Sequence, residues 1–233
     1  YMGSKSRIAK NILPIILKNR KDNQYYIEPF VGGCNMIDKI SNPRMAIDNN
    51  KYLIAMWKGL QDNLIRPREI PKDYYSLVRT SYNNKDNQYS DFIIGWVGFT
   101  ASFNGRFFDG GYSGQTKGRD YIQEQIKNIE KQIPFIQGIE FYSGDYKTIN
   151  YPPNSIIYCD PPYKDTKQYS TSKNFNHEEF WEWCRLMKSQ GHKIFISEYD
   201  APEDFECIWQ KEITNSLNTN ITYKAIEKLY TIN

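Results

Sequence analysis

Metal-binding side chains are scarce in this chain of 233 residues, which has only 4 cysteines and 2 histidines. The cysteines are scattered, with no C-x-x-C pair: Cys34, Cys159, Cys184 and Cys207. This spacing argues against a structural zinc site and against a disulfide framework. We therefore predict a protein that needs no metal ion and keeps its thiols reduced in the cytoplasm.

Long apolar runs and a strong charge imbalance are also missing. No stretch approaches the roughly 18–20 apolar residues of a membrane span. The run at residues 12–17 is short and broken by Pro14, unlike a signal peptide. Lysine and arginine total 30 against 27 acidic residues, so the net charge of +3 permits an acidic partner such as nucleic acid but does not require one.

Apolar residues are present in sufficient number for a full core, at 39% of the chain with 15% aromatic. Short apolar runs predict strands at residues 25–30, 44–48, 139–142, 155–159 and 193–197. Helical patterns lie at residues 4–17, after residue 48, and before residue 193, where Asn176 and Glu179 form a capping-box-like start. Runs at 207–213 and 226–232, joined by an Asn-rich loop, predict a hairpin. The alternation predicts an α/β fold with a parallel sheet covered by helices.

Residues 65–134 interrupt this alternation. They hold two helical candidates, at 90–103 and 120–133, around a polar loop rich in glycine and aromatic residues at 104–118. We predict one domain from residues 1–64 and 135–233, with residues 65–134 as an inserted, mainly helical lobe.

Acids and glycines follow the predicted strands, at the sheet edge where ligands bind in open α/β folds. The turn at Gly32–Gly33 lets a ligand approach the backbone closely, although a glycine pair after a strand is often only a tight turn. Asp48 lies 20 residues after Glu28, a placement that suits a carboxylate bound to ribose hydroxyls or a helix N-cap. Asp145 could contact the edge of an adenine ring or could equally be a turn residue.

The sequence Asp160–Pro161–Pro162–Tyr163 is the most specific signal, because two prolines follow a buried strand directly. Proline fixes φ and removes the backbone N–H. The Asp160 side chain and the Pro161 carbonyl can then face the same point, with Tyr163 as a flat surface beside them.

Together these segments resemble the Dam-type DNA N6-adenine methyltransferases. Five stretches match in order: Tyr1-Met-Gly-Ser-Lys5, Tyr26-Ile-Glu-Pro-Phe-Val-Gly-Gly33, Ala46-Ile-Asp-Asn-Asn50, Tyr158-Cys-Asp-Pro-Pro-Tyr163 and Phe195-Ile-Ser197. Phe103-Asn104-Gly105, in the inserted lobe, resembles part of the family's DNA-reading domain. The order, with the cofactor motif first and the catalytic motif after the lobe, is similar to the family's alpha arrangement.

The resemblance implies a Rossmann-like methyltransferase sheet with a C-terminal antiparallel hairpin. It implies S-adenosylmethionine as cofactor and transfer to the N6 amine of an adenine flipped out of duplex DNA. The implied catalytic residues are Asp160, Pro161 and Tyr163. The implied cofactor-binding residues are Tyr1, Lys5, Glu28, Phe30, Gly32, Gly33, Asp48, Asp145 and Asp160. The residues expected to contact DNA are Asn104, Arg106, Lys117 and Arg119.

One residue departs from the family pattern, because Cys34 stands where the cofactor loop often has a second glycine. This departure leaves open a DNA-binding homologue with weakened catalysis. Two further functions stay open on other grounds: the adenine methyltransferase, and the same chemistry on RNA adenine or DNA cytosine N4. Asp160 rather than serine at the head of the catalytic motif favours adenine. The resemblance implies a bacterial, phage or mobile-element origin and a restriction-modification setting, and it leaves the oligomeric state open.

Overall fold

The computed structural model describes residues 5–116, 118–163, 175–218 and 221–232. A sheet of seven strands, in the order β5-β2-β1-β6-β7-β9-β8, forms its centre. The first five in this order are parallel: β5 (Ile139–Ser143), β2 (Arg44–Asp48), β1 (Tyr26–Glu28), β6 (Ile156–Cys159) and β7 (Lys193–Glu198). The strand order reverses between β1 and β6, and this reversal marks the place where open α/β sheets bind ligands.

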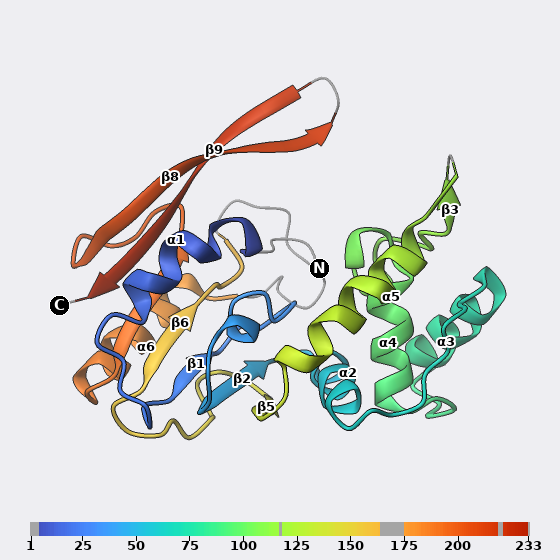
Figure 1. Ribbon diagram of the computed structural model, residues 1–233, viewed down its shortest axis with the longest axis horizontal. Coiled ribbons are helices and arrows are strands. Elements are labelled where there is room, and N and C mark those ends of the chain that lie inside the picture. The colour runs from blue at the N-terminus through green and yellow to red at the C-terminus, as the bar shows by residue number, and fades with distance from the viewer. Residues whose placement is uncertain (1–4, 117, 164–174, 219–220, 233) are drawn as a thin grey trace.

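The hairpin of β8 (Phe205–Asn218) and β9 (Ile221–Ile232) completes the sheet, with β9 antiparallel to β7. It projects well beyond the body of the molecule (Figure 1). The predicted Rossmann-like α/β fold with a C-terminal antiparallel hairpin is confirmed. The hairpin is longer than predicted, because the Asn-rich segment continues the strand ladder as far as Asn218 instead of forming a wide loop.

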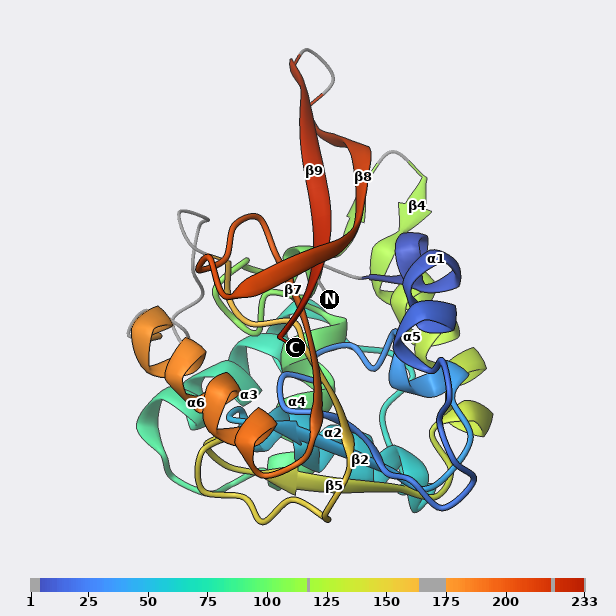
Figure 2. The ribbon, with the colours of Figure 1, turned by 90° about the vertical axis from the view of Figure 1, so that its left-hand side faces the viewer.

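Helices cover both faces of the sheet. The helices α1 (Ser6–Ile16) and α2 (Lys51–Gln61) pack on the face that carries Tyr26 and Tyr158. The helix α6 (His177–Ser189) packs on the face that carries Ile27 and Ile157, opposite α1 (Figure 2). This alternation of neighbouring residues between the two faces follows from the two-residue period of a strand.

Local sequence explains the helix boundaries. Asn176 caps α6 by accepting the backbone N–H of Glu179 at 3.2 Å, as predicted. The helix α1 continues two residues past Pro14, where we expected a kink or an end. Proline removes one backbone hydrogen bond there. The burial of Leu13 and Ile16 against the sheet offsets that loss.

The interrupting region folds into three helices: α3 (Lys72–Asn84), α4 (Asp91–Thr100) and α5 (Tyr121–Gln132). It also carries the short ribbon of β3 (Gln115–Thr116) and β4 (Arg119–Asp120), and 3-10 turns at Phe103–Gly105 and, at its end, Ile133–Phe135. A further 3-10 turn, Ile37–Lys39, lies outside this region, between β1 and β2. The sequence did not predict α3, whose buried face is only Tyr75, Val78 and Ser81.

The helix α4 lies close against α2, so the core runs from the sheet into this region without a break. A Cβ atom at Gly95 would stand 2.0 Å from the Tyr52 carbonyl oxygen, and one at Gly59 would stand 2.2 Å from the Phe92 ring. Glycine at both positions permits this close approach.

Within the described ranges, no helix is long and apolar enough to cross a membrane. The same ranges hold no cluster of three or more histidine, cysteine or acidic side chains suited to a metal ion.

Candidate active site

The turn after β1 and the end of β2 are joined by backbone and side-chain hydrogen bonds. The N–H of Val31 donates to the Ile47 carbonyl at 2.9 Å, and the N–H of Gly32 donates to Asp48 Oδ2 at 3.2 Å. Gly32 has a φ of +48°, a conformation that glycine adopts without strain. On the other side of β2, the N–H of Gly144 donates to the Asp48 carbonyl at 3.1 Å. Asp48 therefore lies at the centre of the carboxyl edge formed by β1, β2 and β5.

Asp48 is not the cap of α2. That position belongs to Asn50, whose side chain accepts the N–H groups of Tyr52 and Leu53. Asp48 Oδ1 instead accepts the N–H of Asn50 at 2.9 Å. Burial raises the pKa of Asp48 to about 6, although its hydrogen bonds from Asn50 and Gly32 oppose the shift. Each carboxylate oxygen keeps a second lone pair that can accept from a ligand hydroxyl.

The remaining cofactor candidates lie in differing environments. Glu28 is buried and accepts the hydroxyl of Tyr26 at 2.9 Å, and burial raises its pKa well above the usual range. Phe30 packs against Tyr146, with ring centroids 5.0 Å apart. Asp145 is exposed at its carboxyl, where Oδ1 accepts the N–H of Lys147 at 2.9 Å. Tyr1 lies outside the described residues.

Cys34 has a left-handed backbone conformation, which glycine adopts most easily. Its φ is +55°, and its side chain is fully buried in the core. The turn therefore keeps a left-handed residue at this position, and the thiol packs in the core cluster that includes Ile37 and Leu53.

Asp160, directly after β6, lies in a cluster of charged and phenolic side chains. Its Oδ1 is 3.3 Å from the ammonium nitrogen of Lys5, and the Lys5 side chain is buried at the start of α1. The same ammonium donates to the Tyr163 hydroxyl and to Oε2 of Glu227, the latter at 3.1 Å. The Tyr163 hydroxyl in turn donates to Glu227 Oε2 at 3.0 Å. The structure thus brings Lys5, Asp160 and Tyr163 together as the motifs imply, and adds Glu227.

Burial and charge oppose each other at Asp160. Burial raises the pKa of its carboxyl to about 6, the nearby Lys5 ammonium lowers it, and the negative charge of Glu227 raises it again. The ion pair with Asp160 and Glu227 outweighs burial at Lys5, so its pKa is raised and it stays protonated. The carboxyl of Asp160 is therefore ionised above about pH 6, where it can accept hydrogen bonds from an amine.

Lys5 and Tyr199 both lie close to the Tyr163 side chain. The Lys5 nitrogen is 2.5 Å from its hydroxyl oxygen and 4.4 Å from the ring centroid. These two distances place the ammonium beside the hydroxyl rather than over the face of the ring. Tyr199 meets the ring edge to face, with centroids 4.6 Å apart.

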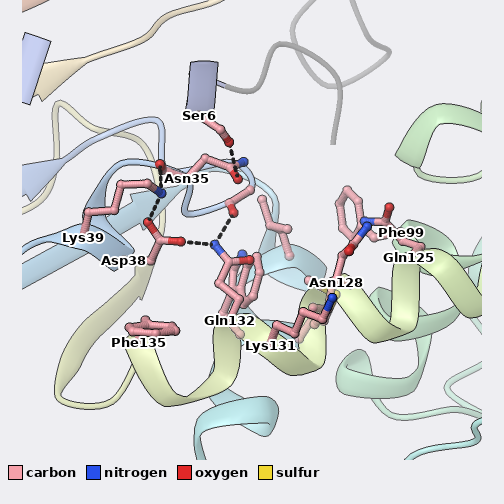
Figure 3. A pocket seen from close by; sticks show the side chains of 15 residues that line it. Ser6, Asn35, Asp38, Lys39, Phe99, Gln125, Asn128, Lys131, Gln132 and Phe135 are labelled. Atoms are coloured by element: carbon pink, nitrogen blue, oxygen red, sulfur yellow. Dashed lines mark hydrogen bonds and ion pairs between the residues drawn. The ribbon is translucent and has the colours of Figure 1, made fainter. Parts of the chain in front are cut away.

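A cavity of about 540 Å³ opens beside the glycine turn, between that turn, α2 and α5 (Figure 3). Asp48, Asp145 and Asp160 do not line it. Gln132, at the end of α5, lies at its wall and donates to the carbonyls of Gly33 at 3.0 Å and Cys34 at 3.1 Å and to the Asp38 carboxylate at 2.9 Å. The interrupting region is therefore tied directly to the glycine turn.

The predicted DNA contacts lie on the interrupting region. Asn104 is exposed with a φ of +55°, and Arg106 is half-buried. Arg119 is exposed, and its Nε and Nη2 donate to the two carboxylate oxygens of Glu124 at 2.9 and 2.6 Å. Lys117 lies outside the described residues. Phe107 and Phe108 are buried in an aromatic cluster and so stabilise the loop from beneath.

Sequence reasoning missed two residues, Glu227 and Gln132. Glu227 stands in a strand expected only to close the sheet, and Gln132 in a helix considered only for its apolar face. Neither belongs to a local motif, and only the fold brings each to the site.

The strand order and the acids at the strand ends define a Rossmann-like methyltransferase. Residues 1–219 match the family described as D12 class N6 adenine-specific DNA methyltransferase, so the chain belongs to that family. Membership implies methyl transfer from S-adenosylmethionine to adenine in DNA.

The chain is similar to two type II methyltransferases and, more distantly, to one solved structure. The type II methyltransferase M.MjaIII of Methanocaldococcus jannaschii is 22% identical over 84% of this chain and 82% of its own. The type II methyltransferase M.FokI of Planomicrobium okeanokoites is 24% identical over 81% of this chain, which spans only 31% of that protein. A crystal structure of SMU.472, a methyltransferase candidate complexed with SAH, aligns over 99% of this chain and 52% of its own at 14% identity and a TM-score of 0.40. That likeness is low, so the fold assignment rests on the strand order.

The residues at the edge of β1 and β2 fit S-adenosylmethionine. Asp48 is half-buried, and its two carboxylate oxygens each accept one backbone N–H, from Gly32 and from Asn50, so each oxygen keeps acceptor capacity for a ribose hydroxyl. The Gly32 turn has no side chain to block the approach of a ligand.

Proposed function

We propose that this chain is a site-specific DNA methyltransferase that acts on the N6 amine of an adenine flipped out of duplex DNA. The observation that carries the proposal is the position of Asp160. It follows β6 at the point where the strand order reverses, beside the Gly32–Asp48 edge, and Lys5 pairs with its carboxylate.

S-adenosylmethionine supplies a methyl group that its sulfonium makes electrophilic. Asp48 would hold the ribose of the cofactor, and Gly32 and Gly33 would let it approach the backbone. Phe30 would provide an apolar contact, while Glu28, Asp145, Lys5 and Tyr1 complete the proposed cofactor set.

The amine of adenine is a poor nucleophile, because its lone pair is delocalised into the ring. The Asp160 carboxylate and the Pro161 carbonyl would accept its two hydrogens and localise the lone pair toward the methyl group. Because this step needs the ionised carboxylate, activity rises with pH as Asp160 loses its proton near pH 6. As the N–C bond forms, the S–C bond of the cofactor would break to leave S-adenosylhomocysteine, and one N6 proton would pass to solvent. The part of this chain would be to hold the amine in line with the methyl group.

The base must leave the stack of the duplex to reach Asp160, at a cost of a few kcal/mol. Tyr163 would offset part of this cost by stacking on the flipped base, for about 1–3 kcal/mol. The hydrogen bond from the Lys5 ammonium to the Tyr163 hydroxyl supports this role, because it would fix the orientation of the ring.

Residues 65–134 would form the target-recognition lobe, and residues 1–64 and 135–233 the catalytic domain. Asn104 and Arg106 would contact the bases, because an amide and a guanidinium read base edges in the major groove. On binding DNA, Arg119 would release Glu124 and bind a phosphate instead. Lys117 would contribute a second positive charge toward the phosphates. The ribbon of β3 and β4 projects in the same direction as the β8–β9 hairpin (Figure 2). In the proposed complex, both would contact the same DNA duplex.

A transfer assay tests this function and its alternatives. The protein is incubated with methyl-labelled S-adenosylmethionine and unmethylated duplex DNA or RNA, and the products are digested to nucleosides. We expect the label in N6-methyladenine from duplex DNA. Label in N4-methylcytosine or in RNA would assign a different substrate, and DNA binding without transfer would identify a homologue with weakened catalysis.

A further inference from the structure

Glu227 is a buried carboxylate, with 6% of the residue exposed, and no motif of the cofactor or catalytic segments contains it. One of its oxygens, Oε2, accepts hydrogen bonds from Lys5 Nζ at 3.1 Å and from the Tyr163 hydroxyl at 3.0 Å. Burying a carboxylate is costly unless it is paired. These two donors therefore tie the position of Glu227 to two side chains of the catalytic cluster.

The register of β9 explains how Glu227 reaches the cluster. Lys228 pairs with Glu198, the last residue of β7, and the two strands are antiparallel. The residue before Lys228 therefore lies beyond the carboxyl end of β7, at the same sheet edge as Asp160. On its other side, Glu227 pairs with Lys211 of β8, which holds β9 in place.

We propose that Glu227 is a positioning residue of the active site, which fixes the Tyr163 hydroxyl and the Lys5 ammonium and thereby sets the charge around Asp160. This inference rests on the proposed function for its catalytic meaning. The hydrogen-bond geometry supports it independently, because Glu227 Oε2 accepts from both Lys5 and Tyr163.

One ammonium lies between two carboxylates in this cluster. Lys5 lowers the pKa of Asp160, and Glu227 raises it. The other titratable groups that face Asp160 from the surrounding strands are Glu28, Tyr158, Cys159, Tyr163 and Tyr199. Removal of the Glu227 charge should therefore shift the titration of Asp160 in the direction opposite to removal of the Lys5 charge.

Two substitutions separate the charge of Glu227 from its hydrogen bonds. In Glu227→Gln, the amide oxygen can still accept from Lys5 and Tyr163, but the charge is gone. In Glu227→Ala, both are lost. Glu206→Gln, at an exposed position on the same hairpin, is the control for a change of net charge.

The first arm needs no catalysis. Carbon NMR of the ligand-free protein, labelled at the aspartate carboxyls, follows the Asp160 signal, which Asp160→Asn assigns. We expect a midpoint near pH 6 in the parent, a lower midpoint in Glu227→Gln, a higher one in Lys5→Met and no change in Glu206→Gln. An unchanged midpoint in Glu227→Gln, or a shift equal to that in Glu206→Gln, would overturn the proposal.

The second arm measures single-turnover methyl transfer to duplex DNA. We expect Glu227→Ala to slow transfer about tenfold, as for a lost hydrogen bond to a charged group, and Glu227→Gln to recover most of that rate above its own midpoint. Full activity in Glu227→Ala would refute the positioning role. A parent protein that transfers no methyl group would instead refute the proposed function, while the NMR arm would still decide whether Glu227 governs Asp160.

Discussion

Replacing Asp48 with alanine is expected to weaken S-adenosylmethionine binding by about tenfold or more. The proposed contact is a pair of hydrogen bonds from the ribose hydroxyls to a carboxylate. Each charge-assisted bond is worth about 1.5–3 kcal/mol, and 1.4 kcal/mol corresponds to tenfold in affinity. Loss of even one such bond therefore reaches the predicted change.

The pH dependence of binding makes the prediction sharper. The pKa of Asp48 is about 6 in the ligand-free protein, because the carboxyl is buried. Donation from two hydroxyls would stabilise the ionised form and lower the pKa in the complex. Affinity is then full above pH 6 and is lost as the pH falls below 6, so that binding at pH 5 is about tenfold weaker than at pH 8. This dependence should disappear in Asp48→Ala.

Calorimetric titration with the cofactor between pH 5 and pH 8 measures both effects. Asp160 titrates in the same range, so Asp160→Asn shows how much of the dependence belongs to that residue. Asp48 also accepts the N–H groups of Gly32 and Asn50, and thermal unfolding therefore checks that the variant remains folded. The exposed Asp62, at the end of α2, provides the matched control Asp62→Asn. An unchanged dissociation constant, or the same pH dependence in Asp48→Ala, would mean that Asp48 only holds the turn.

Two further substitutions test the base and the lobe. With 2-aminopurine in place of the target adenine, Tyr163→Ala should bind the duplex more weakly by about 1–3 kcal/mol, and the flipped base should fluoresce more brightly than in the parent. Tyr163→Phe keeps the ring and should retain the parent affinity. If Tyr163→Ala matches the parent in both affinity and fluorescence, Tyr163 does not stack on the base. Gln132→Ala should weaken cofactor binding severalfold, because the Gly33 and Cys34 carbonyls lose their hydrogen bonds to α5. A dissociation constant equal to that of the parent, measured by calorimetric titration, would show that these hydrogen bonds do not affect cofactor binding.

The sheet was predictable because its strands are short apolar runs that end in acids or glycines. Asp160 and Asp48 could be placed at one edge for the same reason, since parallel strands end on the same side. The helix α3 was missed because its apolar face is only one side of a polar and aromatic sequence. The length of the hairpin was missed because asparagine favours turns, whereas pairing between β8 and β9 overrides that preference.

The charge around Asp160 could not be predicted from sequence. Lys5 and Glu227 are 222 residues apart, and their contact depends on the register of β9 against β7. Likewise, the bonds from Gln132 to the glycine turn depend on how α5 lies against the sheet domain. Local patterns identify residues that end strands, but long-range packing decides which charges those residues meet.

The most direct test of the account is the single-turnover rate of methyl transfer in Asp160→Ala. Asp160 carries the proposed chemistry, and its carboxylate would polarise the amine of the target adenine. We predict that the variant retains its thermal stability and most of its DNA binding but transfers no measurable methyl group to adenine. A folded Asp160→Ala protein that methylates duplex DNA at nearly the parent rate would contradict the account.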